Sequence, residues 1–259
     1  MPPPPGGDDA ALAPFLDDPA RAGVVVDFDG TLSPIVDDPA AARPAPGAAE
    51  ALTALAGRLG LMAVMSGRPV DFLLPHLPPG LTVSGLYGLE VVRDGTRTDH
   101  PDAAPWRSVV ADAVRDAEAG GPEGMDVEPK GLSLTVHYRR RPDLAAAVRA
   151  WAEAEAARTG LTVRDAKMSV ELHPPLPADK GTALEALAGD LAAVCYAGDD
   201  RGDLPAYDAL DRLAGRGVHT LRVAVAGPEV PAPLLARADV TLDGPEALVR
   251  FLRRLAGEG

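Results

Sequence analysis

The most informative segment of the chain is VVVDFDGTL, residues Val24–Leu32. Its three valines in a row, without alternating polar residues, are typical of a strand that is buried on both faces, as in a parallel sheet. We therefore predict a strand over Gly23–Phe28. Because alternate residues of an extended chain point the same way, Asp27 and Asp29 leave the end of this strand toward a common site. Gly30 gives the backbone the freedom for a sharp turn there.

An alternation of helices and strands continues beyond this segment. A helix is predicted over Pro46–Leu59 and a second buried strand over Leu61–Met65, which complete a βαβ unit with the first strand. The same alternation returns from Lys180 to the C-terminus and predicts an α/β domain built on a parallel sheet. Further strands are predicted over Leu81–Ser84, Leu89–Val92, Ala192–Ala197, Leu221–Ala226 and Asp239–Leu242, and further helices over Thr182–Ala188, Leu204–Ala214 and Pro245–Leu255.

The pattern changes in the middle of the chain. Two long helices are predicted there, over Pro105–Ala119 and Pro142–Arg158, together with short strands over Leu132–Tyr138, Leu161–Arg164 and Met168–Leu172. The first of these strands alternates apolar and polar residues, which favours a strand with one buried face. The middle segment is therefore predicted to be a small α+β domain with an antiparallel sheet.

The expected organisation is one α/β core domain, residues 19–102 and 179–259, interrupted by an inserted α+β domain at residues 103–178. Residues 1–18 begin with MPPPPGG and are expected to be a disordered tail. This start lacks the basic and apolar segments of a signal peptide, and no apolar run approaches the roughly 18 residues that span a bilayer. We therefore expect a cytoplasmic protein.

The charge balance excludes several classes of partner. The net charge is −13, so the chain repels nucleic acid and anionic membranes, and neither is expected as a partner. It also repels phosphorylated small molecules, so a phosphate site needs compensation from a metal, a lysine or backbone amides. The single cysteine, Cys195, lies in an apolar run and is expected to be buried. One cysteine cannot form an intrachain disulfide. Separately, we expect the protein to be a monomer.

Asp27 and Asp29 are candidates for chemistry, because two carboxylates held close together suit a hard cation such as Mg²⁺. They also suit a division of labour between a nucleophile and a proton donor. Thr31 adds a hydroxyl beside them. The alternative is that the two acids only end a strand and begin a turn. The preceding valines and the following Gly-Thr-Leu favour the functional interpretation.

The segment DFDGTL resembles the first motif of the haloacid dehalogenase (HAD) superfamily of phosphatases, and the remaining motifs follow in the expected order. Ser66, after the second strand, resembles the motif II residue that binds phosphate. Lys180 resembles the motif III lysine, and GDDRGD at Gly198–Asp203 resembles the acidic motif IV. The resemblance implies a Rossmann-like HAD core. One departure is that many relatives carry Thr-Asp-Glu after the paired acids of motif IV, which this chain lacks.

By this resemblance Asp27 attacks phosphorus and becomes an aspartyl phosphate. Asp29 first protonates the departing sugar oxygen and then activates the water that hydrolyses the intermediate. Mg²⁺ would be bound by Asp27, by the backbone carbonyl of Asp29 and by Asp199. Asp200 is also expected to contribute to this metal site, and Asp203 is expected to lie in or near it.

The residues that would bind phosphate come from two loops: Gly30, Thr31, Ser66, Gly67 and Arg68. Ser66 would act together with backbone amides near Gly30 and Gly67. Lys180 would offset the repulsion between carboxylate and phosphate. For Arg68 two roles stay open, a contact with phosphate and a brace for its own loop.

The insert resembles the type C2 cap of the superfamily, which selects the substrate. Several stretches resemble trehalose-6-phosphate phosphatases in particular: SGR at 66–68, GLYGLE at 85–90, EPKG at 128–131, HYR at 137–139 and KMSVE at 167–171. This resemblance implies hydrolysis of trehalose 6-phosphate, by a phosphatase without a fused glycosyltransferase. The cap residues that it implies for sugar binding are Glu128, Lys130, Arg139, Lys167, Ser169 and Glu171. A solvated sheet face is the alternative explanation for these charges.

Competing functions stay open at this point. Another sugar phosphate, such as sucrose phosphate or a mannosyl phosphoglycerate, could be the substrate on the same scaffold, and only the cap residues favour trehalose 6-phosphate. A non-catalytic sugar-phosphate sensor is a different class of protein. Asp27 and Asp29 argue against it, because a binding protein does not need a nucleophile and an acid together. A phosphotransferase that passes the phosphoryl group to a second sugar is a more remote alternative.

Overall fold

The computed structural model describes residues 7–36, 38–166, 168–227 and 230–258. The chain forms two compact units. The core unit combines Met1–Thr98 with Ala178–Gly259, and the insert unit is Asp99–Pro177; the sequence predicts the insert at residues 103–178. Within the described part of the chain, no helix is both long enough and apolar enough to cross a membrane.

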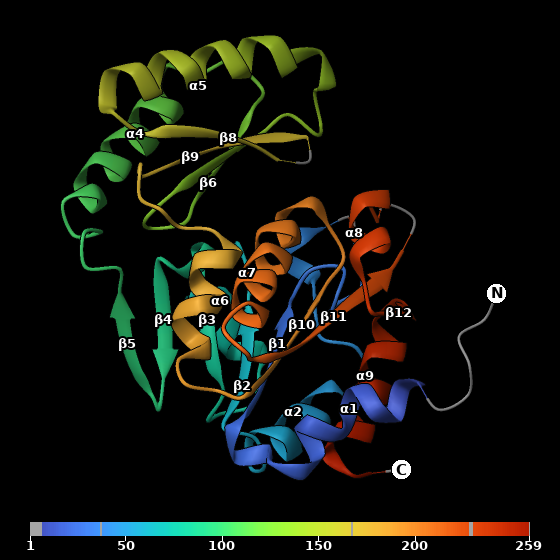
Figure 1. Cartoon of the computed structure of the whole chain (residues 1–259). Coiled ribbons are helices and arrows are strands. Elements are labelled where there is room, and N and C mark those ends of the chain that lie inside the picture. The colour runs from blue at the N-terminus through green and yellow to red at the C-terminus, as the bar shows by residue number, and fades with distance from the viewer. Residues whose placement is uncertain (1–6, 37, 167, 228–229, 259) are drawn as a thin grey trace. The chain divides into compact units, whose positions relative to one another are not determined.

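The core unit is built on an eight-stranded sheet with strand order β12-β11-β10-β1-β2-β3-β4-β5 (Figure 1). Neighbouring strands from β12 to β3 pair in parallel, and β4 pairs antiparallel with β3. The predicted α/β class with a parallel sheet is confirmed. The strands are β1 Ala22–Asp27, β2 Leu61–Met65, β3 Thr82–Gly85, β4 Glu90–Arg93, β5 Thr96–Asp99, β10 Ala193–Gly198, β11 His219–Ala226 and β12 Val240–Asp243.

Helices cover both faces of this sheet. Val24 and Val26 of β1 pack in one apolar cluster with residues of α1, α2 and α9, whereas Val25 packs in a second cluster with residues of α6, α7 and α8. All three valines are fully buried, which explains why the strand shows no polar alternation. The helices are α1 Gly7–Asp17, α2 Ala48–Ala56, α3 Val70–Leu73, α6 Lys180–Ala188, α7 Leu204–Ala214, α8 Ala232–Arg237 and α9 Gly244–Ala256.

The prediction of a disordered tail is wrong over Gly7–Asp17, which forms helix α1. Leu12 and Phe15 lie on one face of this helix, and both are buried in the apolar cluster that also contains Val24 and Val26. The ring of His219 packs edge-on against Phe15. Two buried large apolar residues in a short segment of mainly Ala and Asp are a weak signal in the sequence, but their burial offsets the entropy lost on ordering the segment. The first six residues lie outside the described part of the chain.

The insert unit is a four-stranded antiparallel sheet with strand order β6-β7-β9-β8, and its helices α4 and α5 lie on one face (Figure 1). Leu134 and Val136 of β7 and Val170 and Leu172 of β9 are buried against these helices. The prediction of a separate antiparallel α+β fold is confirmed. The elements are α4 Trp106–Gly120, β6 Asp126–Pro129, β7 Leu134–His137, α5 Ala145–Thr159, β8 Thr162–Ala166 and β9 Ser169–His173.

Candidate active site

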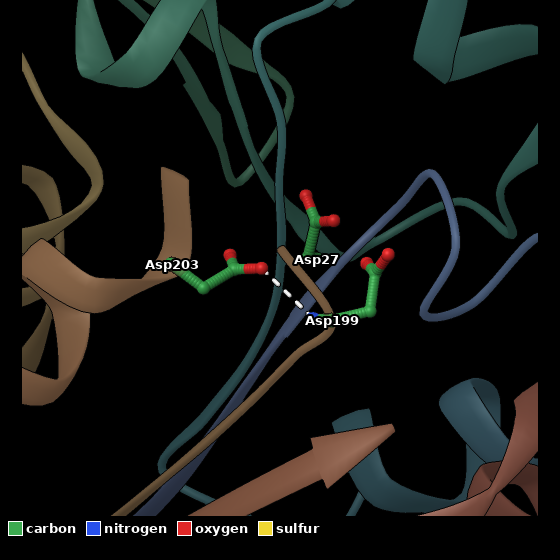
Figure 2. A group of neighbouring side chains, drawn as sticks. All are labelled: Asp27, Asp199 and Asp203. Carbon is green, nitrogen blue, oxygen red and sulfur yellow. Dashed lines mark hydrogen bonds between the residues drawn. The ribbon is translucent and has the colours of Figure 1, made fainter. Parts of the chain in front are cut away.

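Three carboxylates gather at the carboxyl ends of β1 and β10, which are neighbouring parallel strands. Asp27 is the last residue of β1, and Asp199 and Asp203 follow β10 (Figure 2). Each offers one oxygen, and these oxygens lie within 4.8 Å of one another. Because ligands bind at the carboxyl ends of the strands in open α/β sheets, this carboxylate cluster marks the candidate site.

The turn after β1 positions the Asp199 carboxylate. Gly30 has a φ angle of +81°, a backbone conformation that residues with a Cβ atom rarely adopt. A Cβ atom added to Gly30 would also overlap the Asp199 carboxylate. Thr31 Oγ1 donates a hydrogen bond of 2.8 Å to Asp199 Oδ1. The predicted site residues Gly30 and Thr31 therefore hold the second carboxylate in place.

Asp203 has the most hydrogen-bond donors of the three carboxylates. Its Oδ1 accepts hydrogen bonds of 2.6 Å from Lys180 Nζ and from Tyr196 Oη. Its Oδ2 accepts bonds of 2.9 Å from the backbone N–H groups of Asp199 and Asp200. The loop after β10 is thus anchored on Asp203. The sequence did not indicate Tyr196 as a site residue, because a tyrosine inside an apolar strand has the pattern of core packing.

Lys180 joins two members of the carboxylate cluster, Asp27 and Asp203. Its side chain is 5% exposed, and Nζ lies 2.7 Å from Asp27 Oδ1 and 2.6 Å from Asp203 Oδ1. Lys180 is the first residue of α6, and the preceding Asp179 caps this helix by accepting a hydrogen bond of 2.7 Å from the Thr182 N–H. The capped helix start therefore fixes where the lysine side chain enters the site.

Burial and crowding set the charges of this cluster. Burial raises the pKa of the Asp27 carboxyl well above its usual range; Lys180 opposes the rise and Asp203 adds to it. Burial likewise raises the pKa of Asp199 to about 7, with Asp203 as a further cause and the Thr31 hydroxyl opposing it. Burial also disfavours the charge of Asp203, but Lys180 and the other donors outweigh it and lower its pKa. For Lys180 burial is outweighed by Asp203 and Asp27, and its pKa is raised.

A cation fits this cluster, because the Lys180 ammonium contacts Asp27 and Asp203 and leaves the third carboxylate, Asp199, without an ion pair among the described residues. Burial, with Asp203 as a further cause, raises the pKa of Asp27 and Asp199, so a bound cation would stabilise their charged forms, and carboxylate oxygens are the ligands that hard divalent ions prefer. Asp203 is already engaged by four donors. Among the described residues, the acidic cluster does not include Asp29 or Asp200, and Asp200 Oδ1 accepts a bond of 2.8 Å from the Gly202 N–H. The predicted roles of Asp29 and Asp200 at the metal stay predictions.

Asp29 is held by Arg68. The Nε and Nη2 atoms of Arg68 donate hydrogen bonds of 2.6 Å and 2.7 Å to the two carboxylate oxygens of Asp29. The guanidinium also lies 4.0 Å from the centroid of the Phe72 ring. Ser66 is buried, and its Oγ accepts a bond of 3.1 Å from the Arg68 N–H. Arg68 therefore braces two of the predicted site residues from one position.

The loop that carries Ser66 is supported by the GLYGLE segment. A Cβ atom added to Gly67 would overlap the ring of Tyr87, so this loop passes close to that side chain. Glu90 is 1% exposed, and its Oε2 accepts a hydrogen bond of 3.2 Å from the Val70 N–H, at the start of α3. Tyr87 and Glu90 of the GLYGLE segment thus support the loop that carries Ser66 and the start of α3. This is the structural role of the segment.

The polar face of the insert sheet joins three of the predicted sugar-binding residues. Glu171 is 3% exposed, and its Oε1 accepts a hydrogen bond of 2.8 Å from Ser133 Oγ and lies 4.0 Å from Lys130 Nζ. Glu128 Oε2 lies 3.8 Å from the same lysine nitrogen and 2.8 Å from His137 Nε2. Lys130 therefore links the two glutamates across the sheet.

The other predicted insert residues lie differently. Ser169 is buried at the start of β9. Arg139 is exposed in the turn after β7 and takes no part in the network around Lys130 that the described residues form. Lys167 lies outside the described residues.

The family model for trehalose-phosphatase matches residues 25–238 of this chain. The chain belongs to the trehalose-phosphatase family. It is 38% identical over 253 residues to the trehalose-phosphate phosphatase of Mycobacterium avium (strain 104), and the match covers 91% of this chain. It covers 62% of that relative, so the chain spans less than two thirds of the curated protein's length.

Solved structures confirm the HAD-like fold. The C-terminal domain of trehalose-6-phosphate phosphatase from C. albicans superposes with a TM-score of 0.73 at 23% identity, over 99% of this chain and 98% of that chain. A haloacid dehalogenase-like hydrolase from Bacteroides thetaiotaomicron superposes with a TM-score of 0.61 at 15% identity, over 90% of this chain and 99% of that chain. At these identities the likeness concerns the fold, with its Rossmann-like core and its insert.

Proposed function

We propose that this chain hydrolyses trehalose 6-phosphate to trehalose and phosphate through an aspartyl phosphate, as the final step of trehalose biosynthesis. The observation that carries the proposal is the buried bridge that Lys180 makes between Asp27 and Asp203 at the strand ends. A carboxylate held beside a fixed ammonium group suits phosphoryl transfer, in which positioning and charge stabilisation do most of the work. The family match and the name of the relative from Mycobacterium avium support the choice of sugar.

Mg²⁺ is the proposed cation, and Asp27 and Asp199 are its proposed carboxylate ligands. The backbone carbonyl of Asp29 and the side chain of Asp200 are further proposed contributors. When bound, Mg²⁺ would neutralise charge that develops on the phosphoryl oxygens. Asp203 is proposed to orient Lys180 and the Asp199 loop, because its oxygens are already engaged by donors.

Asp27 is the proposed nucleophile. Its attack forms a bond from a carboxylate oxygen to phosphorus and breaks the bond from phosphorus to the sugar oxygen. Lys180, 2.7 Å from Asp27 Oδ1, reduces the repulsion between the carboxylate and the incoming phosphate. Water then cleaves the aspartyl phosphate, which releases phosphate and restores the Asp27 carboxylate.

Asp29 is the proposed proton donor to the sugar oxygen and then the proposed base for water. Both of its oxygens accept hydrogen bonds from Arg68, so the two side chains have to separate before Asp29 can exchange a proton with substrate. A phosphate presents the same paired oxygens to a guanidinium as a carboxylate does. We therefore assign to Arg68 an exchange of partners, from Asp29 to the phosphate of the substrate.

The remaining proposed roles concern binding. Ser66 and the backbone amides near Gly30 and Gly67 are proposed to hold phosphate oxygens, and Thr31 supports the metal ligand Asp199. The insert is proposed to select the sugar, because fixed carboxylates and cations recognise hydroxyl groups. The residues proposed for this recognition are Glu128, Lys130, Arg139, Lys167, Ser169 and Glu171.

Phosphate release with Mg²⁺ and with EDTA tests the proposal, using trehalose 6-phosphate, sucrose 6-phosphate and glucose 6-phosphate. We expect Mg²⁺-dependent release with a kcat/KM about a hundredfold higher for trehalose 6-phosphate, nearly 3 kcal/mol of transition-state discrimination. The Asp27→Asn variant, purified in parallel, controls for contaminating phosphatases. Faster release from another sugar phosphate would keep the Asp27 chemistry and reject the trehalose assignment. No release from a folded protein that binds Mg²⁺ would indicate a sensor.

A further inference from the structure

A cross-strand row of four residues runs over the polar face of the insert sheet. Glu128 of β6 pairs with Thr135 of β7, and Thr135 pairs with Glu171 of β9. Glu171 in turn pairs with Arg164 of β8. Directly paired residues of antiparallel strands have Cβ atoms about 5 Å apart. Thr135 therefore lies in the middle of the sheet, between two carboxylate side chains.

The Thr135 hydroxyl is the unsatisfied member of this row. Thr135 is 3% exposed, and its Oγ1 has no hydrogen-bond partner among the residues that the structure describes. Its neighbour Glu171, in contrast, accepts a bond of 2.8 Å from Ser133 Oγ and lies 4.0 Å from Lys130 Nζ and 3.9 Å from Arg164 Nη1. The polar groups around Thr135 are thus organised, while the hydroxyl at the centre lacks a partner.

Folding alone does not explain a threonine at this position. Valine has nearly the same shape and an equal preference for strands, and it would leave no buried hydroxyl without a partner. A buried, unpaired polar group destabilises the native state, and in native structures such a group calls for a specific reason. Local rules of folding are broken mainly at functional positions. The unpaired hydroxyl of Thr135 therefore points to a ligand that supplies its partner.

The groups around Thr135 define the chemistry of that ligand. Glu171 only accepts hydrogen bonds, and Lys130 and Arg164 only donate them. A threonine hydroxyl donates one bond and accepts others, as a sugar hydroxyl does. The set therefore suits a neutral ring with several hydroxyl groups. The side chain of Glu128 is 41% exposed and that of His137 is 24% exposed, so a ligand can approach the polar face from their side, and the buried Thr135 hydroxyl lies one strand pair further in.

We propose that Thr135 is a specificity-determining residue whose hydroxyl binds a hydroxyl group of the sugar in the substrate. The inference rests on the proposed function of the chain and adds a residue that the family motifs did not indicate. It predicts that Thr135 contributes to the recognition of the sugar and not to the chemistry at phosphorus. It also predicts that the position is optimised for ligand binding at the expense of stability.

The test compares Thr135→Val with Thr135→Ser in the full chain. KM and kcat are measured with trehalose 6-phosphate and with p-nitrophenyl phosphate, which carries no sugar, and Tm is measured without ligand. For Thr135→Val we expect KM for trehalose 6-phosphate to rise about tenfold, kinetics with p-nitrophenyl phosphate to stay unchanged, and Tm to rise by about 2–4 °C. Thr135→Ser keeps the hydroxyl and should stay within about twofold of the wild-type KM.

Tyr207→Phe is the matched control. The Tyr207 hydroxyl also lacks a partner among the described residues, but its ring belongs to an apolar cluster of the core unit. Its removal should raise Tm in the same way and leave KM for trehalose 6-phosphate unchanged. An unchanged KM in Thr135→Val would overturn the proposal. So would a fall in Tm together with equal losses on both substrates, because these would mean that the hydroxyl supports the fold.

Failure of the proposed function is recognised separately. In that case the wild-type chain hydrolyses p-nitrophenyl phosphate but not trehalose 6-phosphate. Titration calorimetry with trehalose itself then tests Thr135 directly. Weaker binding of trehalose to Thr135→Val than to the wild type supports the proposal, and equal binding or no binding to either protein contradicts it.

Discussion

The carboxylate cluster of the core unit and the polar face of the insert unit both bury charged side chains, but they differ in how their hydrogen bonds are satisfied. Asp203 accepts four hydrogen bonds from its surroundings, and Lys180 contacts two carboxylates. On the insert sheet, Lys130 stands 3.8 Å and 4.0 Å from its two glutamates. The central Thr135 hydroxyl there has no partner within the described ranges.

The two units thus differ in how far the protein itself completes the contacts of its polar groups. In the core unit Asp27, Lys180 and Asp203 are held against one another by the protein itself, which keeps the reorganisation of this part of the site small. On the insert sheet Lys130 stands farther from its carboxylates, and the Thr135 hydroxyl lacks a partner among the described residues, so a ligand can complete these contacts. We therefore propose that the core unit carries the reaction and that the insert unit selects the sugar.

The largest effect is expected for Asp27→Asn, which keeps the shape of the side chain and removes the proposed nucleophile. We expect kcat to fall by about 10⁴-fold or more with every phosphate ester tested, because the loss concerns the reaction and not the sugar. Steady-state phosphate release measures this, and circular dichroism checks that the variant is folded. Residual activity within tenfold of the wild type would exclude Asp27 as the nucleophile.

The matched pair Lys180→Met and Lys130→Met compares the two units through stability. Lys180→Met leaves Asp27 and Asp203 buried without their cation, which should cost about 3–5 kcal/mol of unfolding free energy. Lys130 is 13% exposed but farther from its partners, and Glu171 keeps Ser133 and Arg164 as neighbours, so Lys130→Met should cost less, about 1–2 kcal/mol. Urea unfolding of both variants provides the measurement. Equal losses would remove the contrast between a tightly bound cluster and a loosely spaced face.

Much of the core site could be predicted from the sequence, because its residues follow apolar strands directly. Asp27 and Asp199 come at the ends of two valine- and alanine-rich runs, and the ends of neighbouring parallel strands meet at one edge of the sheet. The partnership of Asp29 with Arg68 could not be predicted, since it joins two loops through side-chain geometry. Tyr196 escaped detection because its hydroxyl leaves an otherwise apolar strand.

The insert and the helix α1 show a second limit of sequence patterns. The alternation along Leu132–Tyr138 predicted which side chains share a face, but not that one hydroxyl on the polar face would lack a partner. Helix α1 was missed because its apolar face rests mainly on Leu12 and Phe15, with the small Ala11 beside them. The elements β5, β6 and α3 have four residues each, which is too few for a period to appear.

A smaller effect is expected for Tyr196→Phe, which removes one of the four donors to Asp203. A hydrogen bond to a buried charge contributes about 1.5–3 kcal/mol, so unfolding in urea should report a loss in that range. We expect kcat to fall by about tenfold, because Lys180 and the Asp199 loop then lose part of their anchor. A stability equal to that of the wild type would show that Asp203 is satisfied without the tyrosine.

The smallest effect is expected at Cys195, the one thiol in the chain. It is fully buried in the core unit, and burial raises the pKa of its thiol, so the reactive thiolate is scarce at neutral pH. We expect iodoacetamide at pH 7 to leave the native protein unlabelled by mass spectrometry and its activity unchanged. The same protein in urea should be labelled completely. Labelling of the native protein with loss of activity would show that Cys195 is accessible and takes part in the function.

The division of labour between the two units is tested most directly by the ratio of kcat/KM for trehalose 6-phosphate to that for p-nitrophenyl phosphate, in the wild type and in Glu171→Gln. Glutamine keeps the shape of Glu171 and removes the charge that faces Lys130. We predict that the ratio falls by about tenfold, with the value for p-nitrophenyl phosphate unchanged. Equal losses on both substrates, or no loss on either, would contradict the claim that the core unit performs the reaction while the insert unit selects the sugar.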